Sequence, residues 1–164
     1  MVRMSGIALL LATLATVGLS SLPAFAQTED GPKDKRSYIG IGGNIGLNGE
    51  ESALGEGGFS IVSRTRIIEY LSLRNSTVFG DDTASMFALT GEIPLTNASG
   101  DITAIPFLGA GIWLHGEVDP LISAGVDVPL GQDFTLTNRV NFGFDDDDTD
   151  IGVTIGVGYN FELF

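Results

Sequence analysis

The chain lacks cysteine, and it contains one histidine and one tryptophan among 164 residues. The absence of cysteine excludes disulfide bonds and thiolate metal ligands. Basic residues are also scarce: eight lysines and arginines stand against 21 acidic residues, and no lysine occurs after Lys35. This balance argues against nucleic acid as a partner, which needs a basic surface, and against electrostatic attachment to anionic lipid.

Long apolar runs are missing as well, and the one notable run, 7–19, lies near the start of the chain. It follows Arg3 and precedes Ala24 and Ala26. A charged start, an apolar middle and a pair of small residues are typical of a secretory signal peptide. We therefore predict that 1–26 is a signal peptide cleaved after Ala26, which changes the formal net charge from −13 to −14. An uncleaved anchor is the alternative, although a membrane-spanning helix needs about 20 apolar residues.

The rest of the chain is predicted to consist of a flexible polar leader, 27–36, and one β domain, 37–164. In the β domain, apolar and polar residues alternate in eight segments that are separated by turn-forming residues. The segments cover about 39–47, 57–66, 71–79, 86–93, 102–114, 122–128, 134–144 and 151–161. An even number of alternating segments, close to the roughly 9–11 residues of a tilted membrane strand, predicts an all-β fold. The expected architecture is an eight-stranded antiparallel up-and-down transmembrane β-barrel.

The polar face of these segments favours a membrane barrel over a soluble one. A soluble barrel turns its apolar face inward and exposes Lys and Glu, whereas this polar face consists mainly of Gly, Ser, Thr and Asn. We predict that its few charges pair with one another inside a filled lumen, because eight strands enclose just enough space for side chains. These charged residues are Arg64, Arg66, Arg74, Arg139, Glu92 and Asp127. Scattered surface arginines are the alternative.

The connections between the segments predict an orientation. With the N-terminus in the periplasm, the periplasmic turns are 67–69, 95–101 and 129–133. The outer loops are then 48–56, 80–83, 115–120 and 145–150. These outer loops are nearly as short as the turns, although outer loops of such barrels are commonly longer.

Acidic residues gather in the predicted outer loops, most densely at Asp145, Asp146, Asp147, Asp148 and Asp150. Clustered carboxylates suit Ca²⁺ or Mg²⁺, which could bridge the rim to phosphates of lipopolysaccharide. A solvated, repulsive loop edge is the preferred interpretation, because the spacing does not match a defined Ca²⁺ loop.

His115, the only histidine, follows Trp113 and Leu114 at a predicted strand end and lies close to Glu117. No hydroxyl neighbour completes a catalytic arrangement. The sequence therefore predicts neither an enzyme nor a bound cofactor. The aromatic residues near predicted strand ends are interpreted as girdles at the membrane interfaces. They are Trp113, Tyr38, Tyr70, Tyr159 and Phe161.

Two segments resemble parts of known barrels. The segment 152–161, GVTIGVGYNF, is similar to the C-terminal strand of small outer-membrane barrels. The segment 107–112, FLGAGI, resembles the glycine-rich fifth strand of the opacity-type, eight-stranded outer membrane protein β-barrel domain family. The resemblance implies that the barrel assembly machinery recognises a terminal aromatic residue. Tyr159 and Phe161 match that frame, and Phe164 lies in the opposite register, so either Phe161 or Phe164 is the expected signal.

The sequence thus predicts a monomeric, non-catalytic protein of the bacterial outer membrane with a structural or surface-interaction role. Its expected partners are outer-membrane lipid, lipopolysaccharide and the barrel assembly machinery. Two alternatives stay open: a narrow porin or carrier for small molecules, and a secreted soluble barrel that holds a lipophilic ligand inside.

Overall fold

The computed structural model describes residues 36–49, 52–145 and 148–162. The predicted signal peptide, 1–26, and the predicted leader up to Lys35 lie outside these residues. Arg36, expected at the end of the leader, is the first residue of a strand. Within the described part of the chain, no helix is long and apolar enough to cross a membrane.

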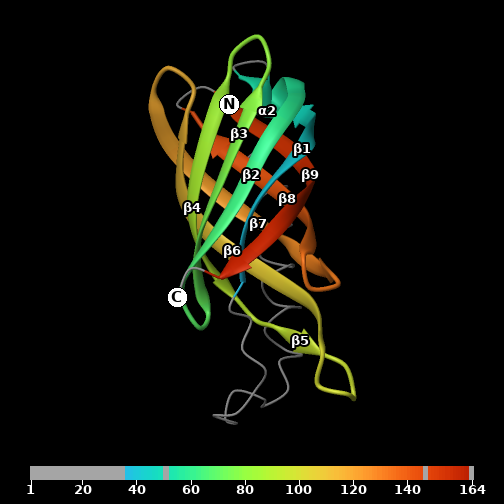
Figure 1. The fold of residues 1–164 in the computed structure, drawn as a ribbon. Helices are drawn as coiled ribbons and strands as arrows, with labels where there is room; N and C mark the ends of the chain where they lie inside the picture. Colours follow the sequence, from blue (N-terminus) through green and yellow to red (C-terminus); the bar gives the residue numbers. More distant parts are fainter. Residues whose placement is uncertain (1–35, 50–51, 146–147, 163–164) are drawn as a thin grey trace. The chain divides into compact units, whose positions relative to one another are not determined.

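The described residues form one short helix and nine strands (Figure 1). Their bounds are β1 (Arg36–Asn48), α2 (Ala53–Glu56), β2 (Gly57–Ile68), β3 (Leu71–Phe79), β4 (Ala84–Glu92), β5 (Leu95–Thr96), β6 (Ile102–Leu114), β7 (Val118–Leu130), β8 (Phe134–Phe144) and β9 (Thr149–Glu162).

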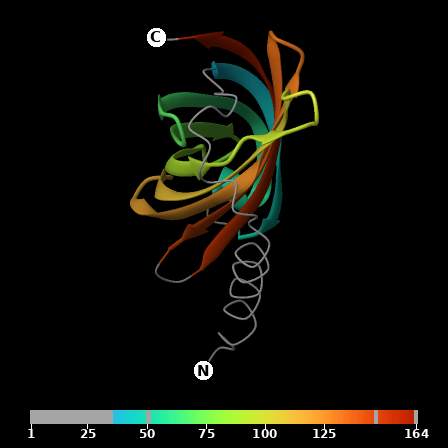
Figure 2. The ribbon, with the colours of Figure 1, turned by 90° about the horizontal axis from the view of Figure 1, so that it is seen from below.

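Eight of these strands close into an antiparallel barrel, as the sequence predicts. Each pairs with its sequence neighbours, β4 pairs with β6, and β1 pairs with β9 to complete the ring (Figure 2). The closing pair runs from Arg36 opposite Glu162 to Asn48 opposite Ile151. The two-residue strand β5 pairs only with the start of β6 and is not part of the ring.

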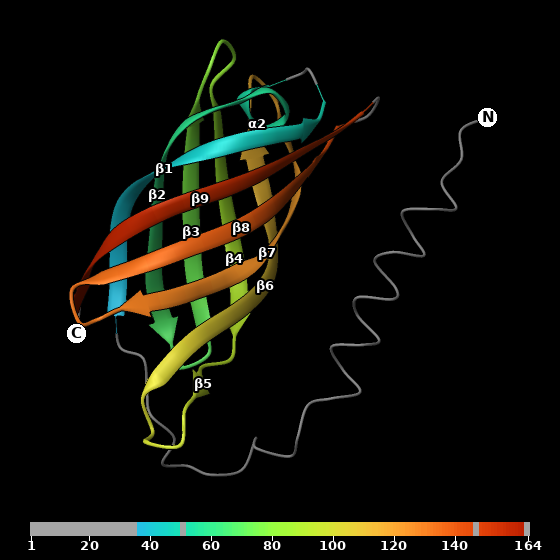
Figure 3. The ribbon, with the colours of Figure 1, turned by 90° about the vertical axis from the view of Figure 1, so that its right-hand side faces the viewer.

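The barrel has two ends, which α2 and β5 mark on opposite sides (Figures 1 and 3). At the α2 end lie the connections β1–β2, β3–β4, β6–β7 and β8–β9. The start of β1, the end of β9 and the remaining connections lie at the β5 end.

The connection 48–56, predicted as an open loop, contains the helical turn α2 instead. Ser52 caps this turn by accepting a hydrogen bond from the Leu54 amide at 3.1 Å. The side-chain amide of Asn44 donates to the carbonyl oxygens of Ala53 and Leu54, at 3.2 and 2.8 Å. Ala53 and Leu54 are fully buried, so the connection folds back over the barrel end. A single turn is too short to leave a helical periodicity in the sequence.

Two further boundaries differ from the prediction. Strand β7 begins at Val118, inside the predicted loop 115–120, and β5 lies inside the predicted turn 95–101. In both places turn-forming residues in the sequence suggest a loop, whereas in the structure these residues pair with β6 and form strands. Tertiary pairing commonly overrides such local preferences.

Alternation along the strands sets which side chains face outward. Ile39 and Ile41 are 57% and 63% exposed, whereas Tyr38 on the same strand is 1% exposed. The segment 102–114, whose two faces look equally apolar in sequence, turns Phe107 and Trp113 inward and Leu108 outward. The apolar faces of the strands therefore lie on the outside of the barrel.

The lumen has a polar half toward β5 and a mixed half next to α2. The sequence predicts a polar interior, and buried polar residues such as Asn44, Asn141 and Asp150 do lie in the mixed half, beside an apolar cluster that the sequence did not predict. This cluster consists of Ala53, Leu54, Val78, Ala84, Met86, Ala88, Trp113 and Leu121. The buried charged residues lie closer to the β5 end than this cluster does. They are Arg64, Arg74, Glu92, Asp127 and Arg139.

Glycines on the inward faces make room for the two largest aromatic rings of the lumen. A Cβ added to Gly143 would lie 2.6 Å from Cε2 of Trp113, and one added to Gly158 would lie 2.5 Å from Cδ2 of Tyr38. Trp113 and Tyr38 are almost fully buried. Their interpretation as membrane-interface aromatics is therefore wrong, because their positions on the strands turn them into the lumen.

We expect Gly143→Ala to lower the free energy of unfolding by about 1–3 kcal/mol, the usual cost of overpacking a filled core. Gly43→Ala is the matched control, because its added Cβ would meet its nearest atom at 3.9 Å. Urea or guanidinium unfolding of the refolded barrel in detergent measures both. Equal stability of the two variants would contradict the tight packing of Trp113 on Gly143.

Candidate functional site

A hydrogen-bonded network centred on Tyr38 crosses the polar half of the lumen. The Tyr38 hydroxyl donates to Oδ1 of Asp127 at 3.1 Å. It also accepts from Nη1 of Arg74 at 3.1 Å and from Nη2 of Arg139 at 3.0 Å. One phenolic oxygen thus joins side chains from β1, β3, β7 and β8.

Two carboxylates hold the arginines of this network in place. Glu92 pairs with Arg64 and also accepts from Nη2 of Arg74 at 3.0 Å. Asp127 accepts from Nη1 of Arg74 at 2.7 Å. The guanidinium of Arg74 also lies 3.5 Å above the ring centre of Phe107 on β6. Arg74 is therefore the bridge between the two carboxylates.

Burial makes this arrangement energetically sensitive. The side chains of Arg64, Arg74, Glu92 and Asp127 are at most 1% exposed. Taking a charge out of water costs several kcal/mol, and pairing with good geometry offsets that cost. Removal of one partner leaves an uncompensated buried charge, so the members of the network depend on one another.

Arg139 joins the network through neutral acceptors. Its Nη1 donates to the Asn75 carbonyl oxygen at 3.1 Å, in addition to the Nη2 bond to Tyr38. With its neighbours, the network takes side chains from β1, β2, β3, β4, β7 and β8. It ties opposite walls of the barrel together and fills the space between them.

The structure brings together five of the six charged residues that the sequence places in the lumen, all except Arg66. Arg66 is half-buried near the β5 end, where its amide donates to Ser37 Oγ at 3.2 Å. Tyr38, the centre of the network, was missed. It shares the even-numbered face of its strand with Gly40 and Gly42, and that alternation was the signal that could have found it.

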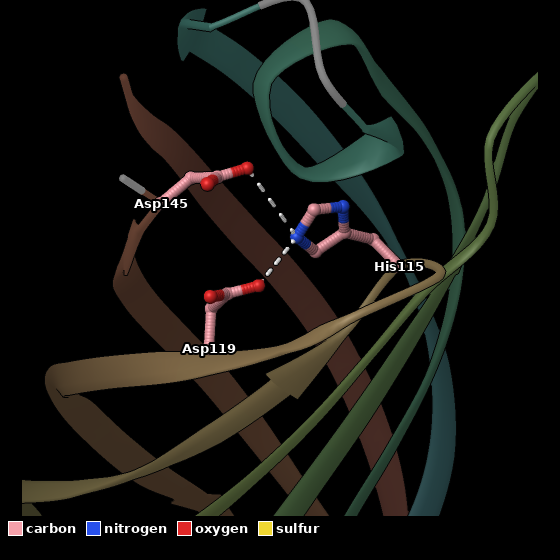
Figure 4. A group of neighbouring side chains, drawn as sticks. All are labelled: His115, Asp119 and Asp145. Atoms are coloured by element: carbon pink, nitrogen blue, oxygen red, sulfur yellow. Dashed lines mark hydrogen bonds and ion pairs between the residues drawn. The ribbon is translucent and has the colours of Figure 1, made fainter. Parts of the chain in front are cut away.

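A second group of polar side chains lies at the α2 end. Nε2 of His115 is 3.0 Å from Oδ2 of Asp119 and 4.0 Å from Oδ2 of Asp145 (Figure 4). The imidazole stacks on Trp113, with 3.8 Å between the ring centres and 29° between the planes. The ligand atoms of the three residues all lie within 4.8 Å of one another.

The five aspartates predicted as weak metal ligands do not form one site among the described residues. Asp145 belongs to the group around His115. Asp148 accepts a hydrogen bond from the Thr149 amide, and Asp150 is buried and accepts from Ser52 Oγ at 2.7 Å. Asp146 and Asp147 lie outside the described residues.

The aromatic residues proposed for assembly lie at the end of β9. Tyr159 faces outward with 56% exposure and packs edge-on against Phe134. Phe161 lies on the same face of β9 as Tyr159 and is half-buried. Phe164 lies outside the described residues. Tyr70 is also exposed, at the β5 end.

No family model matches the chain, and no curated protein matches it in sequence. The barrel is similar to the N-terminal β-barrel domain of Pseudomonas aeruginosa OprF, with 12% identity and a TM-score of 0.52 over 79% of this chain and 100% of that one. It is similar to a de novo designed transmembrane β-barrel at 15% identity and a TM-score of 0.50, over 79% of this chain and 100% of that one. Ail, the attachment invasion locus protein of Yersinia pestis, gives 16% identity and a TM-score of 0.49, over 78% and 99% of the two chains.

At these identities the first two likenesses show the fold alone. The chain is a small, closed, eight-stranded up-and-down β-barrel with a lumen filled by side chains. Its membership of the opacity-type family stays a prediction.

We expect Tyr38→Phe to lower the free energy of unfolding by about 1–3 kcal/mol, because Arg74, Arg139 and Asp127 lose a hydrogen-bond partner without access to water. Tyr159→Phe is the matched control, since that hydroxyl is on an exposed side chain. Denaturant unfolding in detergent measures both. A Tyr38→Phe barrel as stable as the control would show that the network does not depend on this hydroxyl.

Proposed function

We propose that this chain is an integral protein of the bacterial outer membrane, with a structural or surface-interaction role and without catalysis. The observation that carries the proposal is the outer surface of the barrel, which is apolar on all eight strands. The exposed large apolar residues on these strands include Ile39, Ile41, Ile45, Phe59, Ile61, Leu73, Phe79, Phe87, Leu89, Leu108, Ile112, Val118, Leu130, Phe134, Ile155 and Val157. Exposed apolar surface that runs around a whole molecule is typical of contact with lipid.

The charged residues of the same strands support the proposal. Each of them lies at one of the alternate positions of its strand that face the inside of the barrel. They are Arg36, Arg64, Arg66, Arg74, Glu92, Asp119, Asp127, Arg139, Asp150 and Glu162. A charge on the lipid face of a membrane barrel costs about 2–4 kcal/mol at the midplane for Arg or Lys. Their absence from the outward positions of the described strands is the pattern that a lipid environment selects.

A secreted soluble barrel would show the opposite arrangement. Its apolar residues would face a ligand inside, and its outside would be polar. Here the outside is apolar, and Tyr38, Arg74 and Phe107 occupy the polar half of the lumen. The geometry therefore favours the membrane protein over the lipophilic carrier.

The two ends of the barrel suggest its orientation. Both ends of the β domain lie at the β5 end, which the proposal places in the periplasm. The α2 end then faces outward, with acidic residues that include Asp81, Asp82, Glu117 and Asp148. Lipopolysaccharide is the proposed partner there, with divalent cations between its phosphates and these carboxylates.

The last strand supports an additional partner, the machinery that inserts outer-membrane barrels. Ile155, Val157, Tyr159 and Phe161 share the outward face of β9. They form the alternating frame that the C-terminal strand of such barrels presents. β9 also pairs with β1, so it provides the closing edge of the barrel.

A charge on the outer face separates the membrane protein from a soluble barrel. We expect Ile41→Arg, in the middle of β1, to destabilise the lipid-embedded barrel by about 2–4 kcal/mol. Leu95→Arg is the control, because Leu95 lies on β5 outside the ring. Folding into lipid vesicles across a urea series measures both, and fractionation of cells that express the wild-type chain tests its location.

Recovery of the wild-type chain in the soluble periplasmic fraction would refute the proposal. An Ile41→Arg barrel as stable as Leu95→Arg would refute it too, because a water-facing position tolerates arginine.

Conductance separates the structural role from transport. The Tyr38 network and the apolar cluster fill the lumen, so we expect planar bilayers containing the wild-type barrel to show little or no current. Single-channel recording measures this. Regular openings of defined size from the wild-type barrel would favour the narrow porin instead.

A further inference from the structure

We propose that His115, Asp119 and Asp145 form a binding site for a divalent transition-metal ion, of which Zn²⁺ is the best match, at the α2 end of the barrel. The proposal goes beyond the function proposed above and does not depend on it. It rests on the convergence of three ligands: His115 from the β6–β7 connection, Asp119 from the start of β7 and Asp145 from the β8–β9 connection, shown in Figure 4.

Nε2 of His115 is within hydrogen-bonding distance of Asp119, and all three side chains lie close enough together to share one small metal ion. Zn²⁺ binds histidine nitrogen and carboxylate oxygen at about 2.0–2.2 Å, so ligand atoms around it lie roughly 3.4 Å apart. Here Nε2 of His115 lies 3.0 Å from one carboxylate oxygen and 4.0 Å from the other, and all ligand atoms lie within 4.8 Å. Small rotations of the side chains would supply three of the four ligands of a tetrahedral site, with the fourth position open to water.

Strand register brings the two carboxylates close together. Leu121 of β7 is opposite Gly143 of β8, Asp119 lies two residues before Leu121, and Asp145 lies two residues after Gly143, just past the end of β8. Both carboxylates approach the same atom, Nε2 of His115. Like charges in opposed positions destabilise a sheet, so a cation bound among the three side chains would offset the repulsion between the carboxylates.

The surroundings hold the three ligands in place. The side chains of His115, Asp119 and Asp145 are 7%, 17% and 27% exposed, so they are shielded while a path to solvent remains. The imidazole is packed on Trp113, which fills the space above Gly143. Restricted side chains lose less entropy when they bind, and this favours binding.

The ligand set selects the class of metal. One imidazole and two carboxylates suit Zn²⁺ and its neighbours in the first transition series. Ca²⁺ and Mg²⁺ prefer sites made only of oxygen. The expected ion therefore differs from the Ca²⁺ or Mg²⁺ that the aspartate run alone suggests.

The full barrel, refolded in detergent, is titrated with ZnCl₂ in competition with a chromogenic chelator. We expect one Zn²⁺ per chain, and we expect Asp145→Asn and Asp119→Asn each to weaken binding at least about tenfold. Asp82→Asn is the matched control, because Asp82 is an exposed acid at the same end of the barrel. Zn²⁺ should also raise the melting temperature of the wild-type barrel and not that of Asp145→Asn.

A spectroscopic measurement reports on His115 itself. Trp113 is the only tryptophan of the chain and stacks on this imidazole. Bound Co²⁺, whose d electrons quench indole emission at short range, should therefore quench Trp113 in the wild-type barrel and not in His115→Gln. Heat-modifiable gel migration shows whether each variant is folded. If His115→Gln does not fold, the loss of Co²⁺ quenching in Asp145→Asn tests the site instead, because this variant keeps the stacked rings of Trp113 and His115.

Three results would overturn the proposal. The first is equal Zn²⁺ affinity of Asp145→Asn and Asp82→Asn, which indicates diffuse binding to an acidic surface. The second is displacement of Zn²⁺ by an equal concentration of Ca²⁺, which excludes a nitrogen ligand. The third is unchanged Trp113 emission in the wild-type barrel at saturating Co²⁺.

Discussion

The pairing of β1 with β9 is the constraint on which the rest of the structure depends. An open sheet leaves the amide and carbonyl groups of its two edge strands without partners, and closure of the sheet on itself removes both edges. Closure of eight strands fixes a narrow lumen, and the alternation of side chains then assigns every strand residue to the inside or the outside. That one pairing therefore creates the interior that side chains fill and the exterior on which the apolar faces of the strands lie.

The narrow lumen is filled in two chemically different ways. Near α2, side chains such as Leu54, Met86 and Trp113 pack as in the core of a soluble protein. Toward β5, a network of arginines and carboxylates converges on the hydroxyl of Tyr38. The apolar cluster needs only complementary shapes, whereas every charged member of the polar half needs a partner, because water cannot replace a lost one. The polar half therefore specifies the relative positions of opposite walls more strictly.

Much of this fold could be predicted from the sequence, because a strand repeats its environment every second residue. The eight segments and the barrel follow from that period. The pairing of particular charges could not be predicted, since Arg74 and Asp127 are 53 residues apart and meet only across the closed lumen. The group of His115, Asp119 and Asp145 was missed for the same reason: its third member comes from a different connection. The turn α2 was missed because four residues carry no period of their own.

The sequence by itself determined the strands, their two faces and the strong excess of acidic residues, because these properties are local or additive. The composition of the two faces also favoured the apolar face as the outer one. Only the tertiary structure decided which inward charges meet, because Arg74 contacts Glu92 and Asp127 across the closed lumen. Closure also placed Tyr38 and Trp113 inside the barrel, where inward glycines leave space for their rings.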